Sequence, residues 1–139
     1  MKYEEFLRLE KQRHQERGRY SHIESEIQKS CVAWFRSEYP NYICFAVPNG
    51  GARNRKEAGI MKGEGVLAGV SDLIIVADNA VLFVELKKEG GTQQKTQKEF
   101  QRNVERLGHT YAVCHSVAEF KITVERWLKE KYGVYDTSI

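Results

Sequence analysis

Apolar residues occur along the chain in short runs and spaced stripes, which predict strands and helices in alternation. Two runs of five apolar residues, 73–77 and 80–84, are separated only by Asp78 and Asn79. Short apolar runs joined by two residues that tolerate positive φ are typical of a β-hairpin with a two-residue turn. We therefore expect two antiparallel strands near the middle of the chain.

The expected turn fixes which residues of the two strands face each other. It pairs Ile74 with Phe83 and, further from the turn, Asp72 with Glu85. Carboxylates about 5 Å apart on neighbouring strands repel each other and destabilise a sheet. A divalent cation between them removes the repulsion, because Mg²⁺ binds carboxylate oxygens together with waters or phosphates. Lys87 is expected on the same face as Glu85, since strand side chains alternate, where it could reach a phosphate or an attacking water.

This acidic pair with its lysine indicates metal-assisted cleavage of phosphodiester bonds. The alternative interpretation is that Asp72 and Glu85 are solvated residues at strand ends, and that Glu-x-Lys is a common surface pattern. The agreement in register of Asp72, Glu85 and Lys87 favours the catalytic interpretation.

The remaining apolar stripes predict helices and strands on both sides of the hairpin. The expected elements are a helix from Ser21 to before Pro40, a strand at 42–47, a helix at 92–107, a strand at 110–114 and a helix at 117–131. With the hairpin, this order predicts an α/β fold with an α-β-β-β-α-β core, in which helices flank a mixed sheet. The helix before the last strand is long enough for a parallel crossover connection.

The first 20 residues predict a charged helical extension. It precedes a domain at 21–132 and a tail at 133–139. Ser21 and Glu24 have the spacing of a capping box, which predicts that the first core helix begins at Ser21. Two interpretations of the extension remain open: it packs on the domain, on a second subunit or on nucleic acid, or it is a solvated, frayed segment.

Length and composition restrict the class of protein. The chain has 139 residues, of which 41% are hydrophobic and 29% are charged, as expected for one globular domain. No apolar run is long enough to cross a membrane and the first residues lack the apolar core of a signal peptide, so we expect a cytoplasmic protein.

Cys31, Cys44 and Cys114 are scattered and odd in number, which predicts reduced core thiols. The net charge of +3 permits nucleic-acid binding without arguing for it.

Two polar residues of the expected helices are candidates for the same site. Glu24 leans toward the apolar side of its helix, which Ile27 and Cys31 form, and a carboxylate there needs a partner. In one interpretation it contacts the metal, directly or through a water, and in the other it only caps the helix. Gln97 precedes Phe100 by three residues and shares the inward side of its helix. Its amide either hydrogen-bonds a carboxylate or a phosphate, or belongs to a plain boundary residue.

A basic, glycine-rich stretch leads from the first strand to Asp72. Glycines allow the backbone to approach a ligand closely, and cations contact phosphates without reading the base sequence. The stretch does not match the GxxxxGK[ST] phosphate loop, so we predict no ATP binding. A solvated loop is the alternative interpretation. The candidate nucleic-acid-binding residues are Asn49, Arg53, Arg55, Lys56 and Lys62.

Taken in order, the candidate residues resemble the motifs of the PD-(D/E)XK nuclease superfamily. Finer features at 48–51, 65–72 and 97–100 are similar to the VRR-NUC (virus-type replication-repair nuclease) domain. The resemblance covers about residues 21–116, and Ser71 stands where the superfamily name has proline. The residues that carry it are Glu24, Gly69-Val70-Ser71-Asp72, Glu85-Leu86-Lys87 and Gln97.

The resemblance implies a restriction-endonuclease-like fold and a Mg²⁺- or Mn²⁺-dependent DNA endonuclease. Asp72, Glu85 and the backbone carbonyl of Leu86 would hold the metal, with Glu24 completing the site. Lys87 would orient or help deprotonate the attacking water. The resemblance also implies a stand-alone phage or bacterial form that acts as a homodimer on branched DNA, including Holliday junctions. A nickase or restriction-like nuclease without branch selectivity, and a non-catalytic DNA-binding protein, are the alternatives.

Overall fold

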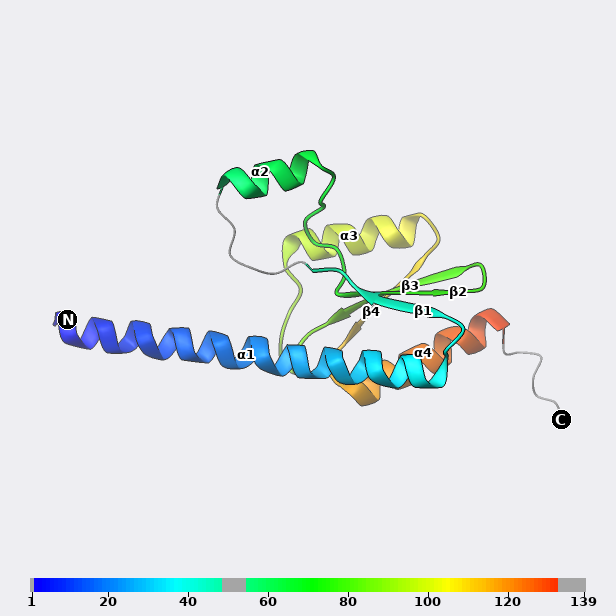
Figure 1. Ribbon diagram of the computed structural model, residues 1–139, viewed down its shortest axis with the longest axis horizontal. Coiled ribbons are helices and arrows are strands. Elements are labelled where there is room, and N and C mark those ends of the chain that lie inside the picture. The colour runs from blue at the N-terminus through cyan, green and yellow to red at the C-terminus, as the bar shows by residue number, and fades with distance from the viewer. Residues whose placement is uncertain (1, 49–54, 133–139) are drawn as a thin grey trace.

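The computed structural model describes residues 2–48 and 55–132, apart from the side chains of residues 10 and 12–21. Helices and strands alternate along the described chain, except where β2 and β3 form a hairpin (Figure 1). They are α1 (Tyr3–Glu38), β1 (Ile43–Ala46), α2 (Arg55–Gly63), β2 (Leu73–Ala77), β3 (Ala80–Leu86), α3 (Lys95–Arg106), β4 (Thr110–Cys114) and α4 (Val117–Tyr132). The expected α/β class and core order are confirmed, and α2 is an additional element.

The four strands form one mixed sheet in the order β1-β2-β3-β4. β2 is antiparallel to both β1 and β3, whereas β3 and β4 are parallel, as the crossover through α3 predicts. The hairpin register is the expected one, with Ile74 opposite Phe83. At the turn, Asn79 has a φ of 55°, a conformation that asparagine tolerates better than most residues.

The sheet has two different faces because side chains alternate along each strand. Leu73 and Ile75 of β2 and Leu82 and Val84 of β3 are fully buried on one face. Figure 1 shows α1 and α4 together on one side of the sheet, and these two helices pack against the buried face. Their contribution to the core consists of Cys31, Phe35, Phe120, Val124 and Trp127.

The opposite face of the sheet packs against α3 (Figure 1). Phe100 of α3 makes edge-to-face contacts with Phe83 of β3 and Tyr111 of β4, with ring centroids 5.5 and 6.0 Å apart. Val104, one turn further along α3, is buried. These contacts hold the first turn of α3 over the ends of β2 and β3, where the candidate site lies.

The first helix is longer than the sequence pattern predicts. α1 runs without interruption from Tyr3 to Glu38, so the expected helix start at Ser21 is wrong. The division at residues 20 and 21 falls inside this one helix. A charged sequence with sparse apolar positions continues as helix when a buried segment follows it, because extending an existing helix adds one hydrogen bond per residue without a new nucleation cost.

The glycine-rich stretch before Asp72 is also more regular than expected. Arg55–Gly63 forms α2, in which no residue is buried. Figure 1 shows α2 set apart from the sheet, on the side of α3. Among the described residues of this stretch, those between α2 and β2 fit the loop interpretation.

The cysteines take the positions that the sequence predicts. Cys31, Cys44 and Cys114 are buried and form no disulfide. Burial raises the pKa of the Cys31 thiol to about 12 and that of Cys44 to about 11, so both remain protonated at neutral pH. Among the described residues, no helix is long and apolar enough to cross a membrane.

Candidate active site

Two carboxylates meet at the end of the β2–β3 hairpin opposite its turn. The last hairpin pair joins Leu73 to Val84. Asp72 and Glu85 occupy the next position on each strand. Both lie on the face that α3 covers, because Leu73 and Val84 point into the core on the other face. The backbone N–H of Leu86 donates to Oδ2 of Asp72 at 2.7 Å, which ties the start of β2 to the end of β3.

Glu85 is a buried carboxylate without a formed hydrogen bond. It is 1% exposed, and neither carboxylate oxygen has a bonded partner. Burial raises the pKa of Glu85, and the charge of Lys87 opposes this rise. Gln93 and Tyr111 lower the same pKa as nearby donors, although neither reaches the geometry of a full hydrogen bond. A buried carboxylate in this state needs a proton or a cation.

Asp72 is partly buried and interacts with charges on both sides. Burial raises the pKa of its carboxyl group, the Leu86 N–H lowers it, and the negative charge of Glu24 raises it again. Asp72 in turn raises the pKa of Glu85. The carboxylates are therefore close enough to repel one another when all are ionised, as the register argument predicts.

α1 brings a third carboxylate to the same end of the sheet. Oε1 of Glu24 accepts a hydrogen bond from the backbone N–H of Lys88 at 3.3 Å. Because α1 begins at Tyr3, Glu24 lies in the middle of the helix, and the capping interpretation is wrong. The observed contact instead links α1 to the segment that follows Glu85.

Lys87 is partly buried directly after β3. Its backbone N–H donates to the carbonyl of Cys114 at 2.9 Å, which continues the pairing with β4 by one residue. The positive charge of Lys87 lowers the pKa of both Asp72 and Glu85. The lysine thus lies within electrostatic reach of both acids.

The first turn of α3 and the loop before β2 lie against each other beside the acids. Oε1 of Gln97 accepts a hydrogen bond from the backbone N–H of Gln94 at 2.7 Å, as part of a capping box. This bond engages the amide oxygen, so the amide nitrogen is the atom that can donate to a substrate. Gly69 has a φ of 87°, and a Cβ there would lie 2.3 Å from the carbonyl oxygen of Thr96. Only glycine allows this close approach.

A groove of about 820 Å³ connects these elements. Its walls include Asp72, Gln97 and Lys62, the last from α2. A substrate in this groove would lie between the basic helix and the first turn of α3. The groove therefore connects Asp72, an expected metal ligand, with Lys62, an expected phosphate-binding residue.

The other candidate nucleic-acid-binding residues divide into two groups. Arg55 and Lys56 are exposed on α2. Asn49 and Arg53 lie outside the described residues. The described cations of this set thus all belong to α2, which presents them to solvent.

The donors at this end of the sheet suit a hard divalent cation. Carboxylate and backbone carbonyl oxygens are the ligands that Mg²⁺ and Mn²⁺ prefer. In the part of the chain that is described, no group of three or more His, Cys, Asp or Glu side chains is arranged to hold a metal. A site here would therefore combine Asp72 and Glu85 with backbone or water oxygens, and the two unbonded oxygens of Glu85 fit that role.

Two residues near Glu85 were not expected from the sequence. Gln93 lies just before α3, and Tyr111 lies in β4. Both influence the pKa of Glu85. The parallel register of β3 and β4, which places Tyr111 opposite Phe83, is the signal that identifies the tyrosine.

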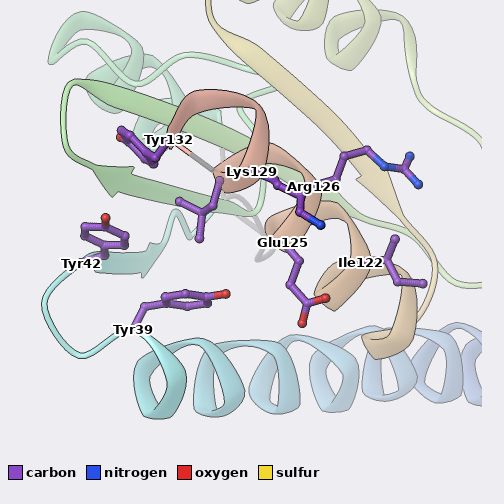
Figure 2. A pocket seen from close by; sticks show the side chains of 8 residues that line it. Tyr39, Tyr42, Ile122, Glu125, Arg126, Lys129 and Tyr132 are labelled. Carbon is purple, nitrogen blue, oxygen red and sulfur yellow. The ribbon is translucent and has the colours of Figure 1, made fainter. Parts of the chain in front are cut away.

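A second cavity, of about 560 Å³, lies at the turn end of the hairpin (Figure 2). Here the Tyr42 hydroxyl donates to Oδ2 of Asp78 at 3.2 Å, and the Tyr132 hydroxyl donates to the Asp78 carbonyl. None of the catalytic residues expected from the sequence lines this cavity. Its lining consists of Tyr39, Tyr42, Ile122, Glu125, Arg126, Leu128, Lys129 and Tyr132.

The mixed sheet with helices on both faces is the fold that the resemblance to PD-(D/E)XK nucleases implies. The model of the VRR-NUC domain matches residues 9–118, and the chain therefore belongs to the VRR-NUC domain family. A solved VRR_NUC domain protein has the same fold, with a TM-score of 0.62 and 24% identity over 76% of this chain and 88% of that chain. A comparison with curated proteins finds no match.

Proposed function

We propose that this protein is a metal-dependent DNA endonuclease that hydrolyses phosphodiester bonds and prefers branched DNA such as Holliday junctions. Membership of the VRR-NUC family supports a nuclease. The observation that carries the proposal is the Glu85 carboxylate, buried without a hydrogen bond beside Asp72 and Lys87. A purely structural role does not account for it, because burying an unsatisfied polar group costs about 1–3 kcal/mol, and more when it is charged.

The proposed cofactor is Mg²⁺ or Mn²⁺. Asp72, Glu85 and the backbone carbonyl of Leu86 hold it, and Glu24 completes the site directly or through a water. A bound divalent cation lowers the pKa of water and stabilises the negative charge of the transition state. The N–H groups of Leu86 and Lys88 orient Asp72 and Glu24, respectively, from the backbone.

Lys87 and Gln97 act on the substrate side of the acids. Lys87 orients the attacking water and helps to remove its proton, and its charge stabilises the phosphate as negative charge develops. The Gln97 amide nitrogen donates to a phosphate oxygen. Support comes from the charge effect of Lys87 on both acids and from the groove that Gln97 shares with Asp72.

The DNA backbone lies along the groove and α2. Arg55, Lys56 and Lys62 contact phosphates from the helix, and the assignment of Asn49 and Arg53 to the same surface stays a prediction from the sequence. Cationic contacts of this kind give affinity without base specificity. Selection of branched DNA therefore depends on the shape of the DNA.

The remaining expectations belong to the same proposal. Symmetric cutting of a junction needs two active sites, and a two-fold homodimer is the simplest way to supply the second. We place the protein in the cytoplasm of a bacterium or of a phage-infected host. Its division into an extension at 1–20, a domain at 21–132 and a tail at 133–139 stays a prediction.

The test is cleavage of an end-labelled four-way junction with Mg²⁺ or Mn²⁺, beside duplex, flap and single-stranded controls of the same sequence. Glu85→Ala is assayed in parallel. We expect symmetric cuts near the branch point that need the metal and disappear in the variant. The strands cut, their positions and the metal concentration for half-maximal rate are recorded together.

The other outcomes separate the alternatives. Equal cutting of every substrate would leave a nuclease but contradict branch selectivity. Cuts that follow base sequence would indicate a restriction-like enzyme or a nickase. Tight junction binding with no cleavage in either metal would favour a non-catalytic DNA-binding protein.

A further inference from the structure

Tyr111 lies next to Glu85 in the sheet. In the parallel pairing of β3 and β4, Tyr111 is opposite Phe83, and Val113 is opposite Glu85. Paired residues point to the same face, so Tyr111 and Glu85 are diagonal neighbours on the face that α3 covers. Long side chains reach across such a diagonal.

The Tyr111 ring is held in place by α3, whereas its hydroxyl group has no bonded partner. Phe100 contacts the ring edge to face. The residue is 8% exposed, and its hydroxyl oxygen is buried without a formed hydrogen bond. A phenol hydroxyl hidden from water normally finds an acceptor. The two unbonded oxygens of Glu85 are such acceptors, and they lie on the same face of the sheet.

The electrostatics of the two groups agree with this proximity. Burial and the nearby charge of Glu85 both raise the pKa of Tyr111. Tyr111 in turn lowers the pKa of Glu85 as a hydrogen-bond donor. The two side chains are therefore close enough to interact directly.

Gln93 limits the positions that these side chains can take. Its Nε2 donates to Oε1 of Gln101 at 2.9 Å, which ties the Gln93 amide to the middle of α3. From there Gln93 acts on both Tyr111 and Glu85. The Glu85 carboxylate is thus enclosed by a strand neighbour on one side and by α3 on the other.

We propose that Tyr111 is a positioning residue for Glu85: its hydroxyl donates to one carboxylate oxygen and leaves the other for the divalent cation. The inference rests on the proposed function, in which Glu85 is a metal ligand. Hydrogen-bonding partners of metal ligands orient them, and their loss typically weakens metal binding 10–100-fold. If Tyr111 only filled the core, removing its hydroxyl group would leave metal affinity unchanged, because core packing depends on the ring.

The test compares Tyr111→Phe with the wild-type protein. The substitution keeps the ring and its contact with Phe100 and removes only the donor. Mn²⁺ affinity is measured by isothermal titration calorimetry without DNA, and the thermal unfolding midpoint is measured in EDTA. We expect Mn²⁺ binding to weaken by about 10–100-fold, with an unfolding midpoint close to that of the wild type.

Two control variants make the result specific. Tyr132→Phe removes a hydroxyl group that bonds the Asp78 carbonyl at the other end of the hairpin, and it should leave Mn²⁺ affinity unchanged. Glu85→Gln removes the expected ligand itself and should abolish measurable binding. Both proteins are measured under the same conditions as Tyr111→Phe.

The controls also separate the two ways in which the inference can fail. Wild-type affinity in Tyr111→Phe, with binding lost in Glu85→Gln, would overturn the positioning role and leave the metal site intact. Wild-type affinity in Glu85→Gln would overturn the metal site, and the role of Tyr111 with it. Equal weakening in Tyr111→Phe and Tyr132→Phe would show a general effect of losing a hydroxyl group and would also overturn the proposal.

Discussion

The carboxylates at the two ends of the β2–β3 hairpin differ in burial and in hydrogen bonding. At the turn, Asp78 is exposed, its carboxylate accepts a hydrogen bond from the Tyr42 hydroxyl group, and its backbone carbonyl accepts one from Tyr132. At the other end, Glu85 is buried, and its oxygens have no bonded partner. The two carboxylates belong to the same pair of strands, so the difference comes from their surroundings.

This contrast supports the proposal that the end of the hairpin with Glu85 is a functional site. Most buried polar groups of a folded protein are hydrogen-bonded, and an exception needs an explanation. The turn end follows the rule, because two tyrosines connect it to the end of α4 and the start of β1. The end with Glu85 departs from it, as expected where a site is organised for a ligand instead of for the stability of the free protein.

The largest expected effect is the loss of cleavage in Glu85→Gln. We expect the rate at saturating Mg²⁺ to fall by about 10³-fold, because the variant loses a charged ligand of the ion that stabilises the transition state. The matched control is Asp78→Asn at the turn end, which should cleave within about twofold of the wild type, since a neutral oxygen still accepts from Tyr42. Similar losses in the two variants would show that the ends do not differ in function.

A smaller loss is expected when Lys87 is replaced by methionine. Removing the cation that acts on Asp72 and Glu85 should lower the maximal rate by about 10²-fold, the usual share of a positioned acid–base group. Lys129→Met removes an exposed lysine that lines the cavity at the turn end and should leave the rate unchanged. Single-turnover kinetics on a junction substrate measure both. A Lys87→Met protein with the wild-type rate would contradict a role for this lysine.

Backbone constraints should also differ between the two ends. Gly69→Ala introduces a Cβ that would clash with the Thr96 carbonyl, in addition to the unfavourable positive φ. We expect it to lower the free energy of unfolding by about 3 kcal/mol. Asn79→Ala at the turn carries only the penalty for positive φ and should cost about 1 kcal/mol. Urea unfolding measures both, and equal costs would mean that the loop moves away from α3 without penalty.

The smallest expected effect is a gain in stability of the metal-free protein. Burial raises the pKa of Glu85, so the folded state holds this proton more tightly than the unfolded chain. The group stabilises the fold at pH values below its unfolded pKa, and that contribution is lost as the pH rises through the raised folded value. Glu85→Gln should therefore be more stable than the wild type at neutral pH in EDTA, by about 1–2 kcal/mol.

The pH dependence of that gain distinguishes its cause. Urea unfolding in EDTA at pH 4 and pH 7.5 should show the advantage of Glu85→Gln shrinking at the lower pH, where the wild-type carboxyl group is protonated. Asp78→Asn should show no such gain at neutral pH, because Asp78 is exposed and hydrogen-bonded. A destabilised Glu85→Gln protein at neutral pH would mean that the ionised carboxylate stabilises the metal-free fold, and would contradict this prediction.

Local patterns were sufficient to predict the hairpin and its acidic end. The two-residue turn at Asp78 and Asn79 sets the register by itself, so the proximity of Asp72 and Glu85 follows from counting. The last strand was also predicted with its observed bounds, because Gly108 ends α3 in a left-handed conformation just before it. Short-range chemistry governs each of these features.

Features that depend on distant contacts were not predictable in the same way. The capping pattern at Ser21 is present in the sequence, but continuation of the helix prevails over it. The proximity of Tyr111 and Glu85 depends on the parallel register of β3 and β4, which no tight turn determines. Gly69 was noted as part of the glycine-rich stretch and of the motif that ends at Asp72, whereas its requirement comes from the carbonyl of Thr96 on another element.

The unbroken length of α1 has a mechanical consequence. Its C-terminal half is fixed in the core through Cys31 and Phe35, whereas Tyr3 at the other end is exposed. Glu24 stands between these regions, about 30 Å along the helix from Tyr3 at 1.5 Å per residue. A force on the exposed outer turns therefore tilts the helix about its core-packed half. This tilt would strain the hydrogen bond between Glu24 and the Lys88 backbone.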